Sequence, residues 1–387
     1  MAGDIGEHLS QFFGDLADPR RDHTRRHLLI DIIVITICAV LGGADDFEAV
    51  AEFGQAKESW LRTFLALPNG IPAHDTFWRV FRALDPVAFE RCFRAWVAAV
   101  IELHPGQVIA VDGKTLRRAH DRCVGQGPLH LVSAWATANE VVLGQLRVEE
   151  KTNEIVAVPE LIEQLDVAGC LVTTDALNCQ VKTAERIVAK QGDYLLALKE
   201  NQPALLDDVR DLFDDLAASH ERAYAVSTNK TVDSGHGRIE TRRVWVIDDP
   251  EVLRLLASTD RWPHLRSLIK VESQRRLLAG DQPPTPASVE TRYYISSAKG
   301  SAAFFNQAVR THWRIENSAH WVLDMAFRED ESRLRKDNGA ENMATLRRMA
   351  LSLLKQDKTV KLGIKNKRLK ATWDHDYLIR LLTLMMN

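Results

Sequence analysis

Apolar residues recur at intervals of three and four along the first part of the chain, the spacing that places them on one face of an α-helix. The pattern is clear in FEAVAEFGQAKESWLRTFLAL and in FWRVFRALDPVAFERCFRAWVAAVIEL. We therefore predict an all-helical domain over residues 1–104, ended by Pro105 and Gly106. The most apolar stretch, residues 27–43, carries Asp31 and is shorter than the about 20 apolar residues that cross a bilayer. We interpret it as a buried helix.

After Gly106 the period changes from helical to strand-like. The runs QVIAVDGK, HLVSAWAT and VVLGQLRV predict three strands, the last two joined by a short polar turn. A helix (VPELIEQL), a strand (CLVTTDA), a second helix (QVKTAERIVAKQG) and a further strand (DYLLALK) follow. The order β-β-β-α-β-α-β is that of the RNase H-like fold. We predict an α/β (α+β) domain with a mixed sheet flanked by helices.

The remaining chain predicts an insertion and a closing helix. An acidic helix, LLDDVRDLFDDL, precedes four strand-like stretches, and a long helix, AAFFNQAVRTHWRIENSAHWVLDMAF, comes next. The expected domains are a helical domain over 1–104 and the first part of the RNase H-like core over 105–201. They continue with a β-rich insertion over 202–298 and, over 299–387, the long helix and a basic helical carboxyl-terminal segment.

Composition narrows the class of protein. With 45% hydrophobic and 27% charged residues the chain is globular. Five scattered cysteines without a C-x-x-C pair argue against a disulfide framework or a zinc site. No secretory signal or membrane span is visible, so we expect a cytoplasmic protein. The net charge of −3 does not indicate nucleic acid, but basic clusters at 20–26 and 361–370 are compatible with DNA binding.

Two aspartates follow apolar strands. Asp112 comes after VIAV and Asp175 after LVTT. Carboxylates at such positions are costly unless a cation lies between them, and a divalent metal is the usual compensation. The alternative is that each aspartate merely caps a turn. For two such residues, each after a strand of the right rank in an RNase H-like order, we favour a metal site.

A third carboxylate is expected on the long helix. Within HWRIENSAHWVLD, the residues Glu316, His320 and Asp324 are spaced by four and share roughly one face. Glu316 is the choice, and the acidic run 329–331 offers competitors that we interpret as structural. The alternative is that Glu316 is an isolated glutamate on an amphipathic helix and is simply solvated.

Three carboxylates suit phosphodiester cleavage. Two Mg²⁺ ions can activate the attacking oxygen and stabilise the leaving oxygen, and magnesium prefers hard oxygen ligands; Mn²⁺ is the alternative ion. Nearby basic groups would hold phosphates. The alternative for each is an exposed charge with no partner. This alternative is stronger for Arg118 than for Lys114. The candidates are Lys114, Arg117, Lys199, His236, Arg238 and Arg314.

Several blocks together resemble a known family. VDGKTLRRA, TTDALNCQ, YLLALKENQP, HGRIETRR and HWRIENSAHWVLDMAFREDESR occur in this order. They resemble the hallmarks of the H-repeat-associated insertion-sequence transposases, a bacterial DDE group with an RNase H-like catalytic domain. The resemblance implies that Asp112, Asp175 and Glu316 are the catalytic, metal-binding triad. Arg118 and Glu200 depart from the pattern, where a small residue and glycine are common.

The leading hypothesis is therefore a DDE transposase that cuts DNA at element ends and transfers the strand. Its partners would be terminal inverted repeats, target DNA and further copies of the chain, as a homodimer or higher oligomer. The alternatives are an RNase H-fold nuclease that does not join DNA and a domesticated, inactive DNA-binding protein. The helix around HDTFWRVFR is a candidate for groove contact, and an equally weighted alternative is that it belongs to the core.

Overall fold

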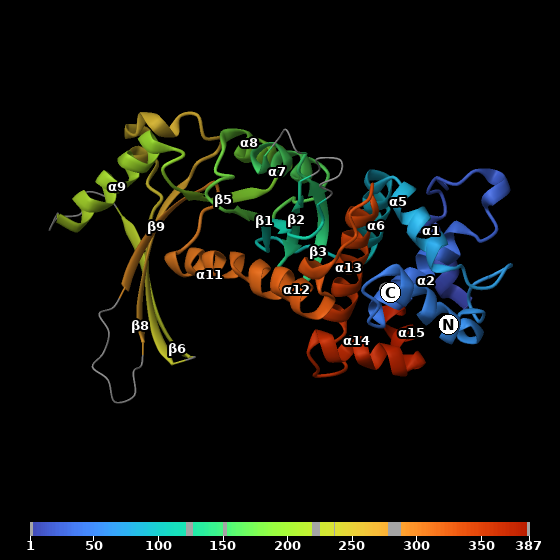
Figure 1. The fold of residues 1–387 in the computed structure, drawn as a ribbon. Helices are drawn as coiled ribbons and strands as arrows, with labels where there is room; N and C mark the ends of the chain where they lie inside the picture. The colour runs from blue at the N-terminus through green and yellow to red at the C-terminus, as the bar shows by residue number, and fades with distance from the viewer. Residues whose placement is uncertain are drawn as a thin grey trace. The chain divides into compact units, whose positions relative to one another are not determined.

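The computed structural model describes residues 3–120, 127–149, 153–218, 225–235, 237–277 and 288–384 (Figure 1). The chain forms two compact units that interleave along the sequence. Unit 1 consists of Met1–Leu103, Gly113–Asn153 and Ile315–Asn387, and unit 2 of His104–Asp112 and Glu154–Arg314. The expected linear division differs from this grouping, because the first and last parts of the chain fold together.

The amino-terminal part of unit 1 is helical. Its helices are α1 (Gly3–Phe13), α2 (Leu29–Leu41), α3 (Phe47–Ala56), α4 (Glu58–Leu61), α5 (His74–Ala83) and α6 (Pro86–Val100). The apolar stretch forms the buried helix α2, as expected, and its Asp31 accepts a hydrogen bond from the Leu67 backbone N–H at 3.0 Å. No helix in the described part of the chain has the length and apolar character needed to span a bilayer.

The rest of unit 1 packs around one buried helix. The hairpin of β2 (Leu129–Ala136) and β3 (Val141–Arg147) is antiparallel, as predicted. The carboxyl-terminal helices are α12 (Trp321–Phe327), α13 (Gly339–Gln356), α14 (Ile364–Trp373) and α15 (His375–Thr383). Helix α13 contacts α2, α5, α6 and β3 and is buried along nearly all of its length (Figure 1).

Unit 2 is built on parallel strands. Strand β1 (Val108–Leu116) pairs in parallel with β4 (Leu171–Thr174), which pairs in parallel with β5 (Asp193–Leu198). Helices α7 (Glu154–Glu163) and α8 (Val181–Ala189) lie on one side of these strands, and α11 (Ala302–His312) lies on the other (Figure 1). The buried side chains of Val108, Leu171 and Phe305 form part of the core beneath α11.

The predicted insertion extends the same sheet. Its elements are α9 (Pro203–Ala218), β6 (Val226–Gly235), β7 (Arg238–Ile247), α10 (Pro250–Leu255), β8 (Ser267–Leu277) and β9 (Ser288–Ser296). Strand β9 pairs antiparallel with β5, so the described strands follow the order β3-β2-β1-β4-β5-β9-β8-β7-β6. The first five strands in this order have the RNase H-like arrangement, and the predicted fold class is confirmed.

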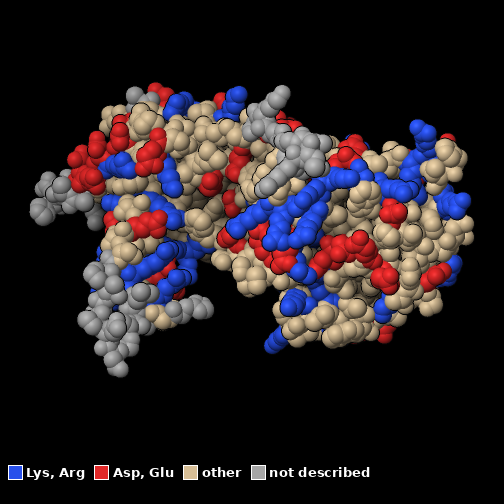
Figure 2. All heavy atoms as spheres, viewed as in Figure 1, with Lys and Arg blue, Asp and Glu red and all other residues tan. Residues whose placement is uncertain are grey.

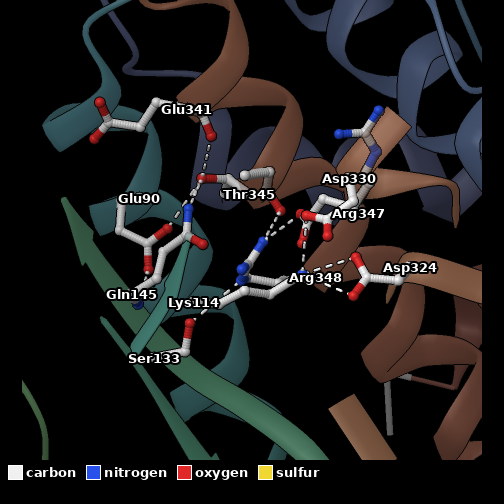
Figure 3. Close-up of polar contacts among 12 residues, drawn as sticks. Glu90, Lys114, Ser133, Gln145, Asp324, Asp330, Glu341, Thr345, Arg347 and Arg348 are labelled. Carbon is white, nitrogen blue, oxygen red and sulfur yellow. Dashed lines mark hydrogen bonds and ion pairs between the residues drawn. The ribbon is translucent and has the colours of Figure 1, made fainter. Parts of the chain in front are cut away.

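A buried carboxyl connects three elements of unit 1. Glu90 of α6 accepts hydrogen bonds from the Gln145 backbone N–H of β3 at 2.8 Å and from the Thr345 hydroxyl of α13 at 3.2 Å (Figure 3). Burial raises the pKa of Glu90 to about 7, although the hydrogen bond from Gln145 opposes the shift. The carboxyl therefore holds its proton more tightly in the folded chain than in the unfolded chain.

This coupling predicts a pH-dependent stability. Because the folded pKa lies above the unfolded value of 4.5, the folded state binds the extra proton, and stability from Glu90 falls as pH rises from 4.5 to about 7. Glu90→Gln removes the titration and keeps an acceptor for Gln145. As pH rises across this range, we expect the free energy of unfolding of the variant to increase by roughly 3 kcal/mol relative to that of wild type. Denaturant unfolding at each pH measures this difference. A constant difference between the two proteins would contradict the prediction.

Candidate active site

The register of β1 and β4 brings the two expected aspartates to adjacent strands. Val111 of β1 is paired with Thr174 of β4, so Asp112 and Asp175 are the next residues on two parallel neighbours. Both side chains are half-buried, whereas the residues just before them are buried. Asp112 lies inside β1, which continues to Leu116, and does not end the strand as the sequence pattern suggested. Both aspartates belong to unit 2.

Asp175 makes specific contacts in the turn after β4. Its Oδ1 accepts hydrogen bonds from the Asn178 backbone N–H at 3.2 Å and from the Asn178 side-chain amide at 2.8 Å. The same amide also donates to Glu154 at 3.0 Å. One oxygen of Asp175 thus supports the turn, as the simpler alternative proposed. Its Oδ2 has no hydrogen-bond partner among the described residues and is available to a ligand.

Asp175 also lines a cavity of about 470 Å³ within unit 2. Lys199 and Arg292 contribute positive charge to the lining, and the Arg292 guanidinium lies 4.9 Å from the ring centre of Trp313. His312, on the same wall, is hydrogen-bonded through Nδ1 to the Thr173 hydroxyl at 2.9 Å. Burial lowers the pKa of His312 to about 4, so its imidazole is neutral at physiological pH. Sequence patterns gave no signal for Arg292 or His312.

Glu316 begins a π-helical turn in unit 1. The expected single long helix is interrupted: α11 ends at His312, a π-helical turn spans Glu316–His320, and α12 follows. Such turns widen the helix by one residue and are frequent at functional sites. The Glu316 side chain is 61% exposed, and its Oε2 lies 3.2 Å from Nδ1 of the buried His320. The hydrogen bond from His320 lowers the pKa of Glu316, which keeps the carboxylate ionised.

Lys114 occupies a different environment from the one expected for a phosphate contact. Its side chain is 8% exposed, and Nζ lies 2.7 Å from Asp324 and 3.3 Å from Asp330 (Figure 3). The ammonium is paired with two carboxylates of unit 1, so it is not an unpartnered cation; its contact with DNA stays a prediction. The ion pair between Lys114 and Asp324 connects β1 to α12. Lys114 comes two residues after Asp112, and α12 is the helix that follows Glu316.

The acidic run after α12 is tied up in ion pairs. Glu329 is fully buried against Arg348 at 2.8 Å. Burial raises the pKa of the glutamate, but the attraction of Arg348, Arg347 and Lys114 and the hydrogen bond from Arg348 together lower it below its usual value. Glu331 is paired with Arg328 through an (i, i+3) contact on the surface. These positions fit the structural interpretation of the run 329–331.

The other basic candidates are distributed over both units. Arg117 is exposed and lies 3.3 Å from Asp330 in unit 1. Lys199, Arg238 and Arg314 are exposed in unit 2, and His236 lies outside the described residues. In the basic carboxyl-terminal segment, Lys367 and Arg368 are buried, whereas Lys361 and Lys365 are exposed.

The candidate groove helix, α5, has two faces. Phe77, Val80 and Phe81 are buried, and α5 packs against α3 and α13. His74, Asp75 and Arg79 on the other side are exposed. The apolar stripe therefore belongs to the core, and only the polar face is accessible.

Comparison with known families decides the class of the chain. The family described as "Transposase DDE domain" matches residues 103–353, and its companion, "DDE_Tnp_1-associated", matches residues 10–97. The chain belongs to the DDE transposase family. The two matched regions together take in the helical amino-terminal part, the RNase H-like sheet and all three candidate carboxylates.

Curated relatives agree over nearly the full length. The "H repeat-associated putative transposase YhhI" of Escherichia coli K12 is 38% identical, covering 97% of this chain and 97% of that protein. The "Putative transposase YncI" of Escherichia coli O157:H7 is 38% identical over 96% of this chain and 93% of its own length. The family expectation from the sequence motifs is confirmed. A solved piggyBac transposase synaptic complex with hairpin DNA aligns at a TM-score of 0.44 and 12% identity, covering 99% of this chain and 81% of that one.

The Lys114 cluster predicts a measurable stability loss. Lys114→Met removes the only ion-pair partner that the described residues give Asp324 and leaves Asp330 with the exposed Arg117 alone. We expect a loss of roughly 2 to 3 kcal/mol in the free energy of unfolding, below the range for a fully buried pair because both aspartates are partly exposed. Asp324→Asn in the same chain should restore part of this loss. Denaturant unfolding measures all three proteins.

Lys355→Met is the matched control. Lys355 is also a poorly exposed lysine paired with a carboxylate, Glu140, but Glu140 keeps a second partner, Lys358, at 2.7 Å. The control should lose less than about 1 kcal/mol. Equal losses in the free energy of unfolding of the two lysine variants would show that Lys114 stabilises the fold no more than an ordinary ion-paired lysine does.

Proposed function

We propose that the chain is an active DDE transposase that cuts DNA at the ends of its element and joins the freed 3′ ends to target DNA. Asp112, Asp175 and Glu316 are the proposed metal-binding and catalytic residues, with Mg²⁺ as the ion and Mn²⁺ as an alternative. The observation that supports the proposal is the parallel register of β1 and β4, in which Val111 is paired with Thr174 and the next residue of each segment is an aspartate. Membership of the transposase family supports the same assignment.

The chemistry of the donors fits a hard divalent cation. All three side chains offer carboxylate oxygens, and the cysteines described in unit 2, Cys170 and Cys179, are buried thiols whose pKa burial raises. Asp175 is pre-oriented by Asn178 through one oxygen, which leaves the other for a cation. Glu316 is exposed and ionised. A cation at this position would offset the repulsion among the carboxylates.

Chain connectivity supports the inclusion of Glu316. The chain passes from unit 2 to unit 1 directly after Asp112 and again after Arg314. Two of the three proposed ligands, Asp112 and Glu316, therefore lie within two residues of a crossing point. Glu331 and Glu329 are farther along the chain and already have arginine partners.

The residues then have distinct tasks. Divalent ions, when bound, supply activation of the attacking oxygen and stabilisation of the leaving oxygen. Asn178 holds the Asp175 carboxylate in one orientation, and the exposed Lys199 at the rim of its cavity is placed to attract a phosphate. His320 holds Glu316 at one oxygen. Water serves as the nucleophile for cleavage, and a DNA 3′-hydroxyl serves for strand transfer.

The partners follow from this proposal. Element ends and target DNA are the proposed substrates, and a homodimer or higher oligomer on DNA is the proposed assembly, because two ends must be joined together. The proposed location is the bacterial cytoplasm, in association with the nucleoid.

The first prediction concerns the three carboxylates. Asp112→Asn, Asp175→Asn and Glu316→Gln should each lower cleavage of element-end DNA by at least about a thousandfold, because each removes a charged ligand. Cleavage is measured on a labelled duplex with Mg²⁺, and circular dichroism checks that the variants fold. Glu331→Gln, a matched exposed glutamate close in sequence, should retain cleavage. Normal activity of Glu316→Gln would remove it from the triad.

The second prediction separates a transposase from a plain nuclease. A pre-cleaved end with a free 3′-hydroxyl should be joined to supercoiled plasmid by the wild-type protein, and a matched end with a 3′-deoxy terminus should not. Joined product is measured by gel mobility. Cleavage without joining would identify a nuclease, and binding without either reaction would identify the inactive DNA-binding alternative.

A further inference from the structure

A short extended segment in unit 1 presents basic side chains that the proposed triad does not use. The segment Arg333–Lys336, with sequence RLRK, follows the acidic run after α12 and precedes α13. Leu334 points inward and packs beside the buried cluster that includes Leu116 and Ala344. In an extended chain successive side chains alternate in direction. The neighbours Arg333 and Arg335 therefore point away from this core, and both are exposed.

The RLRK segment is anchored on two sides. The Arg335 Nε donates a hydrogen bond to the Arg118 backbone carbonyl at 3.1 Å, which joins the segment to the chain after β1. On the other side, the Asn338 backbone N–H donates to the Arg82 carbonyl of α5 at 3.2 Å, and Arg82 forms an ion pair with Asp337. The segment is thus a fixed bridge between α5 and the end of β1, although it has no regular secondary structure.

One arginine on this bridge, Arg333, and one in the turn after β1 to which the bridge is joined, Arg118, carry charge without a partner. Arg118 and Arg333 are exposed, and neither side chain forms an ion pair or hydrogen bond within the part of the chain that the structure describes. Both line a cavity of about 710 Å³ in unit 1 together with Trp78 and the buried Arg347. Figure 2 shows Lys and Arg side chains gathered in a band over this part of unit 1.

Carboxylates also line the cavity, but most are already paired. They are Asp45, Asp46, Glu48, Asp75 and Glu331. Asp45 is paired with Arg368, Asp75 with Arg79, and Glu331 with Arg328. Asp46 accepts from the Ala49 backbone N–H as the cap of α3. Glu48 has no ion pair among the described residues, and Asp46 keeps its charge, so two unpaired carboxylates lie at the start of α3. The unpartnered charge of Arg118 and Arg333 is positive, and it favours an anionic ligand at those two residues.

The aromatic ring in the cavity wall decides between two kinds of contact. Arg82 covers Trp78 at 4.0 Å from the ring centre, and Lys336 lies at 5.9 Å. A ring covered by a guanidinium is not a free platform for an unpaired base. Arginines on a rigid extended backbone suit phosphates, which they bind through two parallel N–H groups.

We propose that Arg118 and Arg333 form a binding site for the phosphate backbone of duplex DNA, held in place by the RLRK bridge. The site rests on the proposed transposase function and adds a contact surface in unit 1 that is separate from the carboxylates. It binds backbone without reading bases, so it contributes affinity for any duplex sequence. Arg118, the departure from the family pattern, gains a role on this account.

The salt dependence of DNA binding tests the site. Each lost phosphate contact lowers the slope of log affinity against log salt by about 0.9. We expect Arg118→Ala/Arg333→Ala to lose about 2 from the slope on both element-end and unrelated duplexes. Between about 50 and 200 mM salt, the advantage of wild type over this variant should therefore shrink about tenfold. Fluorescence anisotropy of a labelled duplex with the full chain measures both.

Two controls make the result decisive. Arg254→Ala/Lys299→Ala removes the same charge from exposed positions of unit 2 and should leave the slope unchanged. Arg118→Lys/Arg333→Lys keeps the charge and should retain most of the slope. An unchanged slope in the alanine pair, or an equal loss in the control pair, would overturn the inference.

The two proposals fail in different ways. Wild-type protein that binds duplex DNA normally, with Glu316→Gln unable to cleave it, upholds the proposed function whatever the arginine result. Wild-type protein with no affinity for duplex DNA would overturn both. Inorganic phosphate is a further test. If it abolishes the difference in salt slope between wild type and Arg118→Ala/Arg333→Ala at concentrations that leave wild-type DNA binding intact, the two arginines form a site for a small anion. That result would also overturn the inference.

Discussion

The parallel pairing of β1 with β4 is the constraint on which the rest of the structure depends. Ile109, Val111 and Val172 are buried completely, because helices cover the strands. Burial decreases at the next position on each strand, and those positions hold Asp112 and Asp175. A shift of one residue in the pairing would turn one strand over and drive its aspartate toward a covered face. Hydrophobic packing of the strands thus fixes the backbone positions from which the side chains of Asp112 and Asp175 extend.

Unit 1 depends on a second constraint, the burial of charged groups around α13. Arg348 and Glu329 are both essentially inaccessible to solvent, yet one nitrogen of the arginine and one oxygen of the glutamate have no hydrogen-bond partner among the described atoms. Such a pair adds little net stability, but removing one partner leaves an uncompensated buried charge. The segment after α12 also contains Asp330, one of the two carboxylates paired with Lys114.

The sequence predicted the sheet, the amino-terminal helices and the fold class because each depends on local periodicity or on strand order. The interruption at Glu316–His320 was not predicted, since a single π-helical turn shifts the apolar spacing by only one residue, which is hard to distinguish from a continuous helix over one or two turns. The interleaving of the units was also not predicted, because it depends on contacts between Met1–Leu103 and the last helices, which are far apart in sequence. The role of the three carboxylates stays a prediction.

Sequence reasoning had the least information on which basic residues are paired inside the protein and which are exposed. Lys114 and Arg118 are four residues apart and both basic, and the sequence favoured Lys114 as the phosphate contact. The structure places Lys114 among carboxylates and leaves Arg118 exposed. The same division holds in the basic carboxyl-terminal segment, where Arg368 binds Asp45 internally while Lys365 stays exposed.

A count of basic residues therefore measures two quantities at once. Cations that satisfy buried carboxylates contribute to the fold, and only the remaining exposed cations create a field that a polyanion can sense. A net charge of −3 is consequently compatible with a local surface that attracts DNA, because the paired cations and their acidic partners cancel inside the protein. Which lysine or arginine belongs to which group is settled by tertiary packing, and no pattern along the chain distinguishes them.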